Sequence, residues 1–183
     1  LLMQGAARVD ACFFHQDALV IAPEMLKMQI VRHFESGETL VLDITEVEIY
    51  RGEEDLACHA SKGRTPRTDV MYLQGGRVYV YLIYGMYWLL NITTGPDNHP
   101  QAILIRSTSQ IKGPGRVGKA LQLDKSFYGE DLNTSNRLWL QWRTHNVTPG
   151  YIRLPRVGID YAGAHWAKIH WRFLTGEPAE DER

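Results

Sequence analysis

The sequence predicts a single compact α+β domain, in which short helices surround a mostly antiparallel, curved β-sheet with a protruding β-hairpin. Segments rich in β-branched residues cluster in the middle of the chain, and the helical patterns lie around them. That order favours an α+β fold over a doubly wound parallel sheet. The chain has 183 residues, which is the length of one ordinary domain, and it shows no internal repeat or dividing linker.

The predicted strands begin with residues 39–50, TLVLDITEVEIY, where apolar and polar residues largely alternate. Residues 78–84 and 88–94 are two more strands, and the tight turn at Gly85 and Met86 makes them a hairpin. The remaining predicted strands span residues 102–107, 156–159 and 169–174, the last two closing the sheet.

The predicted helices are short. Apolar residues recur after Pro23, which suits the first position of a helix, and this helix is expected to run to about Phe34. The others span residues 54–60, 114–121 and 129–136. The charged tail, residues 176–183, is expected to be a frayed terminus.

The composition is that of a soluble globular protein, with 44% hydrophobic and 22% charged residues. It excludes disorder throughout the chain, a collagen-like structure and a coiled coil. No run approaches eighteen consecutive apolar residues, and the first residues lack a signal-peptide pattern, so no membrane association is expected. Cys12 and Cys58 are too few for a disulfide framework and suit a reducing interior.

Charge is distributed unevenly along the chain although the formal net charge is only −1. Residues 35–55 contain eight acidic side chains and one base, whereas residues 61–125 contain nine bases and three acids. Two interpretations remain open. The stretches form two solvated faces that cancel, or the basic stretch grips an anionic partner while carboxylates stay nearby for chemistry.

A first candidate site lies on the strand predicted at residues 39–50. Side chains two residues apart share a strand face, so Glu46, Glu48 and Tyr50 point one way while Val47 and Ile49 point into the core. Two carboxylates and a phenol on one face indicate an acid/base site beside a stacking surface. An exposed polar strand face is the alternative.

A second candidate site is the aromatic hairpin, because residues 78–88 contain five aromatic side chains in eleven positions. Tyr79, Tyr81 and Ile83 share one strand face, and Tyr84 stands at the tip of the turn. Aromatic residues in strands usually pack across strands. A tip position is usually exposed, however, and aromatic side chains beside a basic surface are what base stacking requires.

A third candidate is the glycine-rich segment from Gly113 to Ala120, which satisfies G-x-x-x-x-G-K. It ends in Ala120 where a P-loop needs Ser or Thr to hold magnesium. The segment is therefore a degenerate nucleotide-binding loop, a turn whose N–H groups meet a backbone phosphate, or a plain loop before a short helix. The histidine and cysteine spacings match no metal motif, so no metal and no cofactor are expected.

Together these stretches resemble the alkyladenine (alkylpurine) family of 3-methyladenine DNA glycosylases. Their order and spacing match from about Phe14 to Leu174, which is expected to be the domain core. Val47 and Ile49 stand where the family often has Thr and Ala, and the link from 107 to 113 is shorter than usual. The matching motifs include EVEIYRGEEDLACHA (46–60), VYVYLIYGMYWLLNIT (78–93), GPGRVGKALQLDKSF (113–127) and RVGIDYAGAHWAKIHWRF (156–173).

The resemblance implies a monofunctional DNA glycosylase that starts base excision repair. Such an enzyme flips an alkylated or deaminated purine out of duplex DNA and hydrolyses its N-glycosidic bond. The implied lesions are 3-methyladenine, 7-methylguanine, ethenoadenine and hypoxanthine. The implied partner is double-stranded DNA carrying damaged purines, bound by a monomer inside the cell with the genome. A non-catalytic DNA-damage binding module and a P-loop nucleotide-binding enzyme remain as alternatives.

The resemblance also implies catalytic roles. Glu48 would activate the water that attacks the sugar, and Arg106 and the carbonyl oxygen of Ala57 would help to hold that water. No lysine is evident near the proposed pocket, which favours hydrolysis over lyase chemistry. A neutral lesion would need a proton, from His59 or from water.

Substrate contacts follow from the same resemblance. Asn91 would exclude guanine by a clash with its 2-amino group. Tyr84 would wedge into the gap left in the duplex, with Met86 beside it. The walls around the flipped base would be Tyr50, His59 and Tyr81. The expected DNA-backbone contacts are Arg64, Arg67, Lys112, Arg116, Lys119 and Lys125.

Overall fold

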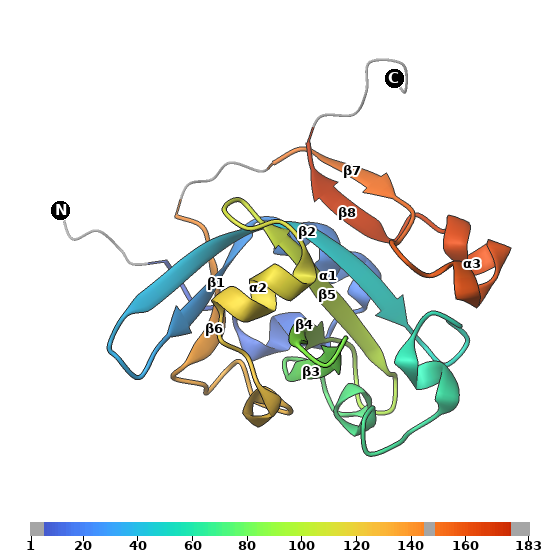
Figure 1. The fold of residues 1–183 in the computed structure, drawn as a ribbon, viewed down its shortest axis with the longest axis horizontal. Coiled ribbons are helices and arrows are strands. Elements are labelled where there is room, and N and C mark those ends of the chain that lie inside the picture. Colours follow the sequence, from blue (N-terminus) through green and yellow to red (C-terminus); the bar gives the residue numbers. More distant parts are fainter. Residues whose placement is uncertain (1–5, 145–148, 177–183) are drawn as a thin grey trace.

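The structure is a computed structural model that describes residues 6–144 and 149–176. Within them, eight strands form one antiparallel sheet: β1 (Met28–His33), β2 (Thr39–Arg51), β3 (Val78–Ile83), β4 (Tyr87–Thr93), β5 (Gln101–Thr108), β6 (Leu138–Trp142), β7 (Tyr151–Leu154) and β8 (Arg172–Thr175). The main path runs β3-β4-β5-β2-β1-β6, and β8 pairs with both β2 and β7 at its side (Figure 1). The predicted α+β fold class is confirmed.

Short helices cover the sheet. They are α1 (Ala18–Met25), α2 (Pro114–Ala120) and α3 (Ala164–Lys168), with 3-10 turns η1 (Ala11–His15), η2 (His59–Lys62), η3 (Asp69–Tyr72), η4 (Lys125–Phe127) and η5 (Asp160–Ala162). Helix α2 packs across β4 and β5, and it crosses the front of the sheet in Figure 1. Among the described residues, no helix is both long and apolar enough to cross a bilayer.

Strand β2 connects the two halves of the sheet and carries the first candidate site. It pairs with β1 over residues 39–43 and with β5 over residues 44–51, and the register shifts near Glu46. Val47 and Ile49 are fully buried in the main hydrophobic core, as their alternation predicts. Glu48 and Tyr50 therefore face the opposite side, toward the hairpin of β3 and β4.

The helix predicted from Pro23 to about Phe34 is wrong. Helix α1 begins earlier, capped by Asp17, and carries Pro23 in its last turn before ending at Met25. The next apolar run is strand β1, held between β2 and β6. A short run that is buried on both faces fits a strand as well as a helix, so periodicity could not separate the two.

Two further helix predictions are also wrong. Only a 3-10 turn, η2, lies near the helix predicted at residues 54–60, and residues 129–136 form turns rather than a helix. Residues 129–136 are rich in Gly, Asp, Asn and Ser, which favour turns, and in residues 54–60 the Asp55 carbonyl and side chain bind the N–H groups of Cys58 and Ala57 in a turn. The helix predicted at 114–121 is confirmed as α2.

Among the strand predictions, those at 39–50, 78–84, 88–94 and 102–107 are confirmed. Residues 156–159 are an irregular segment rather than a strand, and the strand predicted at 169–174 begins only at Arg172. Strands β6 and β7 were not predicted. Of the predicted frayed tail, only Gly176 is described, with its N–H donating to Gly150, and residues 177–183 lie outside the described residues.

Candidate active site

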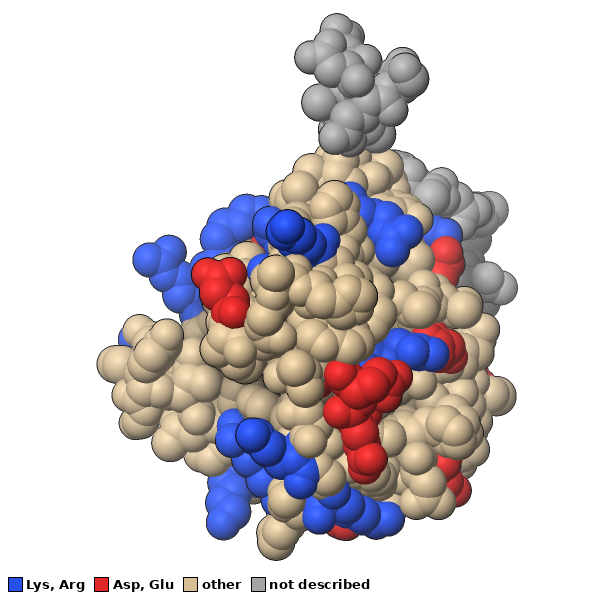
Figure 2. All heavy atoms as spheres, turned by 90° about the vertical axis from the view of Figure 1, so that its right-hand side faces the viewer, with Lys and Arg blue, Asp and Glu red and all other residues tan. Residues whose placement is uncertain are grey.

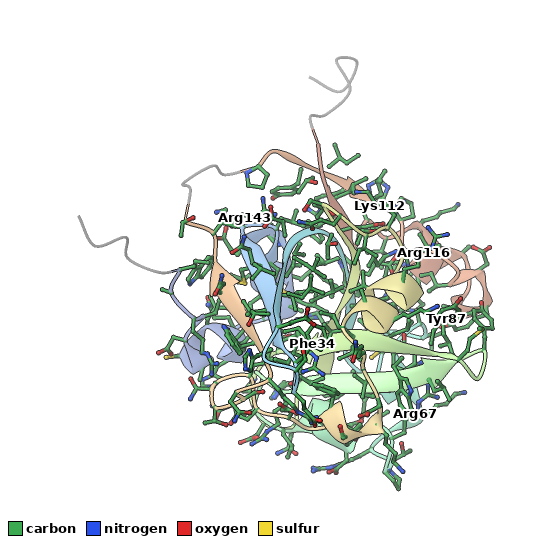
Figure 3. All side chains as sticks on the ribbon, turned by 60° about the vertical axis from the view of Figure 1, so that its left-hand side comes forward. Phe34, Arg67, Tyr87, Lys112, Arg116 and Arg143 are labelled. Carbon is green, nitrogen blue, oxygen red and sulfur yellow. The ribbon has the colours of Figure 1, made fainter. Side chains whose placement is uncertain are left out.

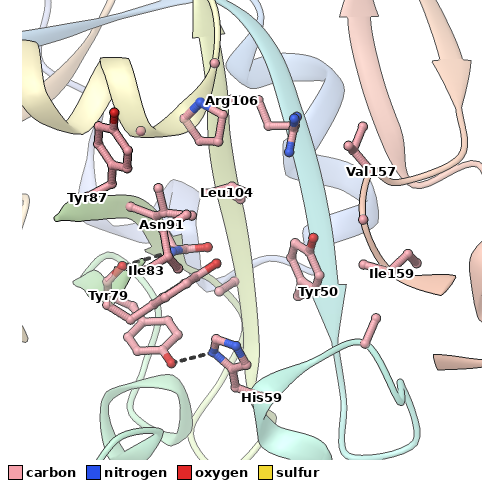
Figure 4. Close-up of a pocket in the computed structure, with 18 of the residues that line it drawn as sticks. Tyr50, His59, Tyr79, Ile83, Tyr87, Asn91, Leu104, Arg106, Val157 and Ile159 are labelled. Carbon is pink, nitrogen blue, oxygen red and sulfur yellow. Dashed lines mark hydrogen bonds between the residues drawn. The ribbon is translucent and has the colours of Figure 1, made fainter. Parts of the chain in front are cut away.

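A cavity of about 690 Å³ opens beside the β3–β4 hairpin (Figure 4). Its walls come from β2, β3, β4 and β5, the start of α2, and the irregular segment 157–161. Most of the predicted site residues meet here although they are far apart in sequence. Those that line it are Tyr50, Ala57, His59, Tyr81, Tyr84, Asn91, Arg106, Lys112 and Arg116.

Glu48 lies directly behind the cavity wall and is fully buried. Its Oε1 accepts the N–H of Val157 at 2.7 Å, and its Oε2 accepts the Tyr50 hydroxyl at 2.8 Å. Arg106 Nη1 lies 3.6 Å from the same Oε2. Burial raises the pKa of the Glu48 carboxyl, and the Arg106 charge, the Val157 N–H and the Tyr50 hydroxyl offset part of that rise. The carboxylate is thus buried, held by two hydrogen bonds and paired with the charge of Arg106.

Glu46 shares the strand face of Glu48 but has different partners. It lies 3.4 Å from Arg106 Nε and 3.1 Å from Arg172 Nη1, and the Ser107 hydroxyl donates to it at 2.7 Å. Arg106 therefore bridges two carboxylates, one of which, Glu46, is paired with a second arginine. Glu46 serves to anchor Arg106, whereas Glu48 is the carboxylate next to the cavity.

The aromatic walls are joined to one another by specific contacts. The Tyr79 hydroxyl lies 2.8 Å from Nδ1 of His59, and the His59 and Tyr81 rings meet edge to face with centroids 4.7 Å apart. Tyr79 lines the cavity as well, although the sequence pattern predicted only its strand face and no role in the site. Burial, and then the charge of Arg67, lower the pKa of His59 to about 4. A ring that is neutral near pH 7 is a poor acid, which favours water over His59 as the proton source for a neutral base.

Asn91 is fixed in the floor of the cavity. It is 2% exposed, it pairs with Tyr79 across β3 and β4, and its Nδ2 donates to the Tyr79 carbonyl at 3.1 Å (Figure 4). That bond holds the side-chain amide in place at the floor of the cavity.

The hairpin tip is exposed and conformationally unusual. Tyr84 is 87% exposed with a φ of +51°, and Met86 is 65% exposed. A non-glycine residue in the left-handed region is uncommon, and Tyr84 adopts it although little of its ring is buried. Figure 3 shows the hairpin projecting away from the sheet.

Basic side chains stand at the rim of the cavity. Lys112 and Arg116 line it at the start of α2, so the expectation that no lysine lies near the pocket is wrong (Figure 3). The short link after β5 turns back, with Ser107 bridged to Lys112, and this brings the lysine to the rim. Lys119 lies beside Met86 in a neighbouring cleft, and Lys125 is exposed on η4, outside both groups of lining residues.

The other two predicted backbone contacts do not line this cavity, although Arg67 lines a neighbouring cleft with Ala57 and His59. Arg67 is exposed, with its guanidinium 5.2 Å from the centre of the Tyr81 ring. Arg64 forms an exposed ion pair with Asp69 at 2.7 Å. Figure 2 shows basic side chains toward the margins of one face, around a mostly uncharged middle with acidic groups between them.

The glycine-rich segment has a packing explanation. A Cβ on Gly118 would lie 1.8 Å from the carbonyl oxygen of Trp88, and one on Gly115 would lie 3.0 Å from the Tyr87 ring. These glycines let α2 approach β4 closely. Of the two glycines in the G-x-x-x-x-G-K match, Gly118 is thus explained by packing, and Gly113 by its φ of +93° at the residue that precedes α2. Among the described residues, no three side chains that could hold a metal ion come together.

The irregular segment 157–161 was missed as part of the site. Val157, Gly158, Ile159 and Tyr161 line the cavity, and the Tyr161 hydroxyl donates to the Ala57 carbonyl at 3.3 Å. The available signal was the RVGIDYAG motif, which contributed to the resemblance but was assigned only a strand.

The model of the methylpurine-DNA glycosylase family matches residues 12–112 and 108–178. The chain belongs to this family. The resemblance inferred from the motifs is confirmed, and with it the assignment to an enzyme class, the DNA glycosylases. This membership argues against the P-loop and non-catalytic alternatives.

Relatives of this chain share most of their length with it. The chain is 39% identical to a protein of Legionella pneumophila, over 88% of this chain and 90% of that one. It is 39% identical to one of Borreliella afzelii, over 90% and 94%, and 35% identical to one of Natranaerobius thermophilus, over 91% and 94%. All three carry the name "Putative 3-methyladenine DNA glycosylase".

Proposed function

We propose that this protein excises 3-methyladenine and related damaged purines from double-stranded DNA by hydrolysing the N-glycosidic bond. The related lesions are 7-methylguanine, ethenoadenine and hypoxanthine. The observation that carries the proposal is the buried carboxylate of Glu48, hydrogen-bonded to the Tyr50 ring that forms one wall of the cavity. Family membership and the names of the relatives point the same way.

The cavity can be reached by a purine only if the nucleotide leaves the base stack. Tyr84 at the hairpin tip is proposed to fill the space that the nucleotide leaves, with Met86 beside it. The extruded base would stack among Tyr50, His59 and Tyr81. The basic rim residues would hold the phosphates on either side of it, which positions the duplex without reading its sequence.

The reaction itself needs only water and a base. Water attacks C1′ of the sugar, its proton passes to Glu48, and the electron pair of the broken C1′–N bond leaves with the purine. The carboxylate also stabilises the positive charge that develops on the sugar. Arg106 and the carbonyl oxygen of Ala57 are proposed to hold the water, and Arg106 is itself held by Glu46.

The damaged bases differ in their charge, and therefore in how readily they leave the sugar. An alkylated purine is already a cation and departs as a neutral base, and tyrosine faces attract such a cation by roughly 0.5–2 kcal/mol per contact. Hypoxanthine and ethenoadenine are neutral and must gain a proton, for which water is the proposed source. No step involves an amine, and Lys112 is assigned to a phosphate.

The experiment is base release from a defined duplex. The protein is incubated with a duplex that contains one hypoxanthine or ethenoadenine, and abasic sites are then cleaved with hot alkali. We expect strand breaks at the lesion only, none in the undamaged duplex, and none before alkali treatment. Absence of breaks at these lesions and at 3-methyladenine would refute the proposal, and breaks before alkali would indicate a lyase step. Tight ATP binding would instead support the P-loop alternative.

The proposal includes the setting in which the enzyme works. We propose that it acts as a monomer on genomic DNA inside the cell. The cavity, the hairpin tip and the basic rim all belong to one chain, so a second copy is not needed to complete the site.

A further inference from the structure

A second ion pair lies beneath the cavity and has no part in the mechanism above. Arg156 and Asp55 are both fully buried at their side chains, and two hydrogen bonds of 2.6 and 2.9 Å join them. Removing two charges from water costs free energy, and an apolar pair of similar volume often stabilises a fold at least as much as a buried ion pair does. The positions of the other bonds that this pair makes indicate why it is there.

Asp55 binds the backbone at the end of β2 and in the turn that follows it. Its carboxylate accepts the N–H of Arg51 at the end of β2 and the N–H of Ala57 in the following turn, each at 3.1 Å. Arg156 Nη1 also donates to the Ile49 carbonyl at 2.8 Å. The pair therefore fixes Ala57, which lines the cavity, relative to the strand that carries Glu48.

Arg156 also supports the aromatic wall and the segment that follows it. Its guanidinium lies 4.9 Å from the centre of the Tyr50 ring and 5.1 Å from that of Trp171. Tyr50 lines the cavity whereas Arg156 does not, so the guanidinium supports the ring from outside the cavity. The next residue, Val157, donates its N–H to Glu48.

We propose that Arg156 and Asp55 are positioning residues for base excision, which hold the Tyr50 ring and the Val157 N–H in register with the Glu48 carboxylate. This inference rests on the proposed function. One buried pair thereby positions three groups of the same site: the Tyr50 ring, the Val157 N–H that donates to Glu48, and the backbone of Ala57. Loss of the pair should misplace Glu48 while leaving the DNA-binding rim intact.

The variants are chosen to separate the effect of the charge from that of the side-chain shape, and both from a general loss of stability. Arg156→Lys keeps a cation but cannot make the two-pronged bond, Asp55→Asn keeps the shape, and Arg156→Met removes the cation. The matched control is Arg137→Met, because Arg137 also pairs with a carboxylate, Glu130, and stacks on a ring, Phe127, at 3.8 Å. Arg137 lines a different cleft.

The measurement is the single-turnover rate of hypoxanthine release as a function of pH, together with duplex affinity. The Val157 N–H favours the ionised form of Glu48, so its displacement raises the carboxyl pKa and moves the acid limb of the rate profile to higher pH. The other titratable and charged groups that face Glu48 are not substituted in these variants. They are Tyr50 and Glu46 from β2, Tyr81 from β3 and Arg106 from β5, with Arg172 of β8 paired to Glu46.

We expect Arg156→Lys and Asp55→Asn to lower the maximal rate by about tenfold or more, since small misplacements at a reacting centre are costly. Their acid limb should rise by roughly one pH unit, while lesion-duplex affinity stays within about threefold. Arg156→Met should be slower than Arg156→Lys if it folds, and Arg137→Met should match the wild type. Amide hydrogen exchange at Val157 should become faster in the Arg156 variants.

Two results would overturn the inference while the proposed function stands. One is that Arg156→Lys and Asp55→Asn release base at the wild-type rate, with the acid limb of the rate profile at the wild-type pH. The other is a lower rate with an unmoved limb, which indicates a smaller folded fraction and a merely structural pair. A wild-type protein that releases no base refutes both proposals.

Discussion

The hydroxyl of Tyr50 donates a 2.8 Å hydrogen bond to Oε2 of Glu48, so the stacking wall and the buried carboxylate form one unit. The two residues are neighbours on one face of β2, and the bond joins the group that would contact the base to the group that would act on the sugar. The bond and the nearby charge of Glu48 add to burial in raising the pKa of Tyr50 well above its ordinary value. Tyr50 therefore remains a neutral donor throughout the working pH range.

The hairpin tip tests the proposed wedge. Tyr84 is almost fully exposed, so Tyr84→Ala should change the free energy of unfolding little. It should slow base release from duplex DNA strongly and from single strands much less, because only the duplex has a stack to be opened. The control is Leu82→Ala, an exposed residue of the same hairpin. Equal losses on duplex and single-stranded substrates would contradict the wedge.

The basic rim predicts a salt dependence. Phosphate contacts release counterions, so about four to six contacts imply a slope of log K against log salt near −4 to −5 for plain duplex. Filter binding or fluorescence anisotropy over a range of salt concentrations measures it. A slope flatter than about −2 would mean that these side chains are mostly a solvated face.

Asn91 tests the exclusion of guanine. Guanine differs from hypoxanthine by its 2-amino group, and a fixed side chain against that group can cost roughly 1–3 kcal/mol. Asn91→Ser opens the space and should gain slow release of undamaged guanine, especially from mispairs, while activity on hypoxanthine survives. If guanine in mispairs stays untouched, Asn91 is a structural residue of β4, and its bond to Tyr79 is its whole role.

His59 predicts a pH dependence of stability. Its folded pKa, about 4, lies below the ordinary value of 6.5, so the folded state holds the ring neutral. The contribution of the neutral ring to the free energy of unfolding is fully present above pH 6.5. It is lost as the pH falls toward 4, by up to about 1.4 kcal/mol per pH unit. Denaturant unfolding at a series of pH values should show this loss in the wild type and in His170→Gln, an exposed control, but less in His59→Gln. The same pH dependence in all three proteins would refute the burial argument.

The sequence predicted the central strands and most of the site because their signals are local. Alternation places Glu48 and Tyr50 on one face of β2, and a tight turn places Tyr84 at a tip. Strand β1 was mistaken for a helix because burial on both faces removes alternation. Strands β6 and β7 are short, and their pairing is set by partners distant in sequence, which no local pattern reveals.

The site residues that were missed depend on tertiary contacts. Val157 contributes a backbone N–H, and backbone groups carry no residue-specific signal. Lys112 was predicted as a DNA-backbone contact, but its position at the cavity rim was missed because it depends on the short link after β5 folding back. The partition of roles between Glu46 and Glu48 likewise became visible only when Arg106 and Arg172 were located.

The most direct test of the mechanism is Glu48→Gln, measured as single-turnover base release from a hypoxanthine duplex together with binding of that duplex. The amide has nearly the same shape but cannot accept a proton from water, so base release should be abolished while lesion binding stays close to that of the wild type. Glu46→Gln, the matched control, should lose far less, because Glu46 only anchors Arg106. Base release by Glu48→Gln at the wild-type rate would contradict the account.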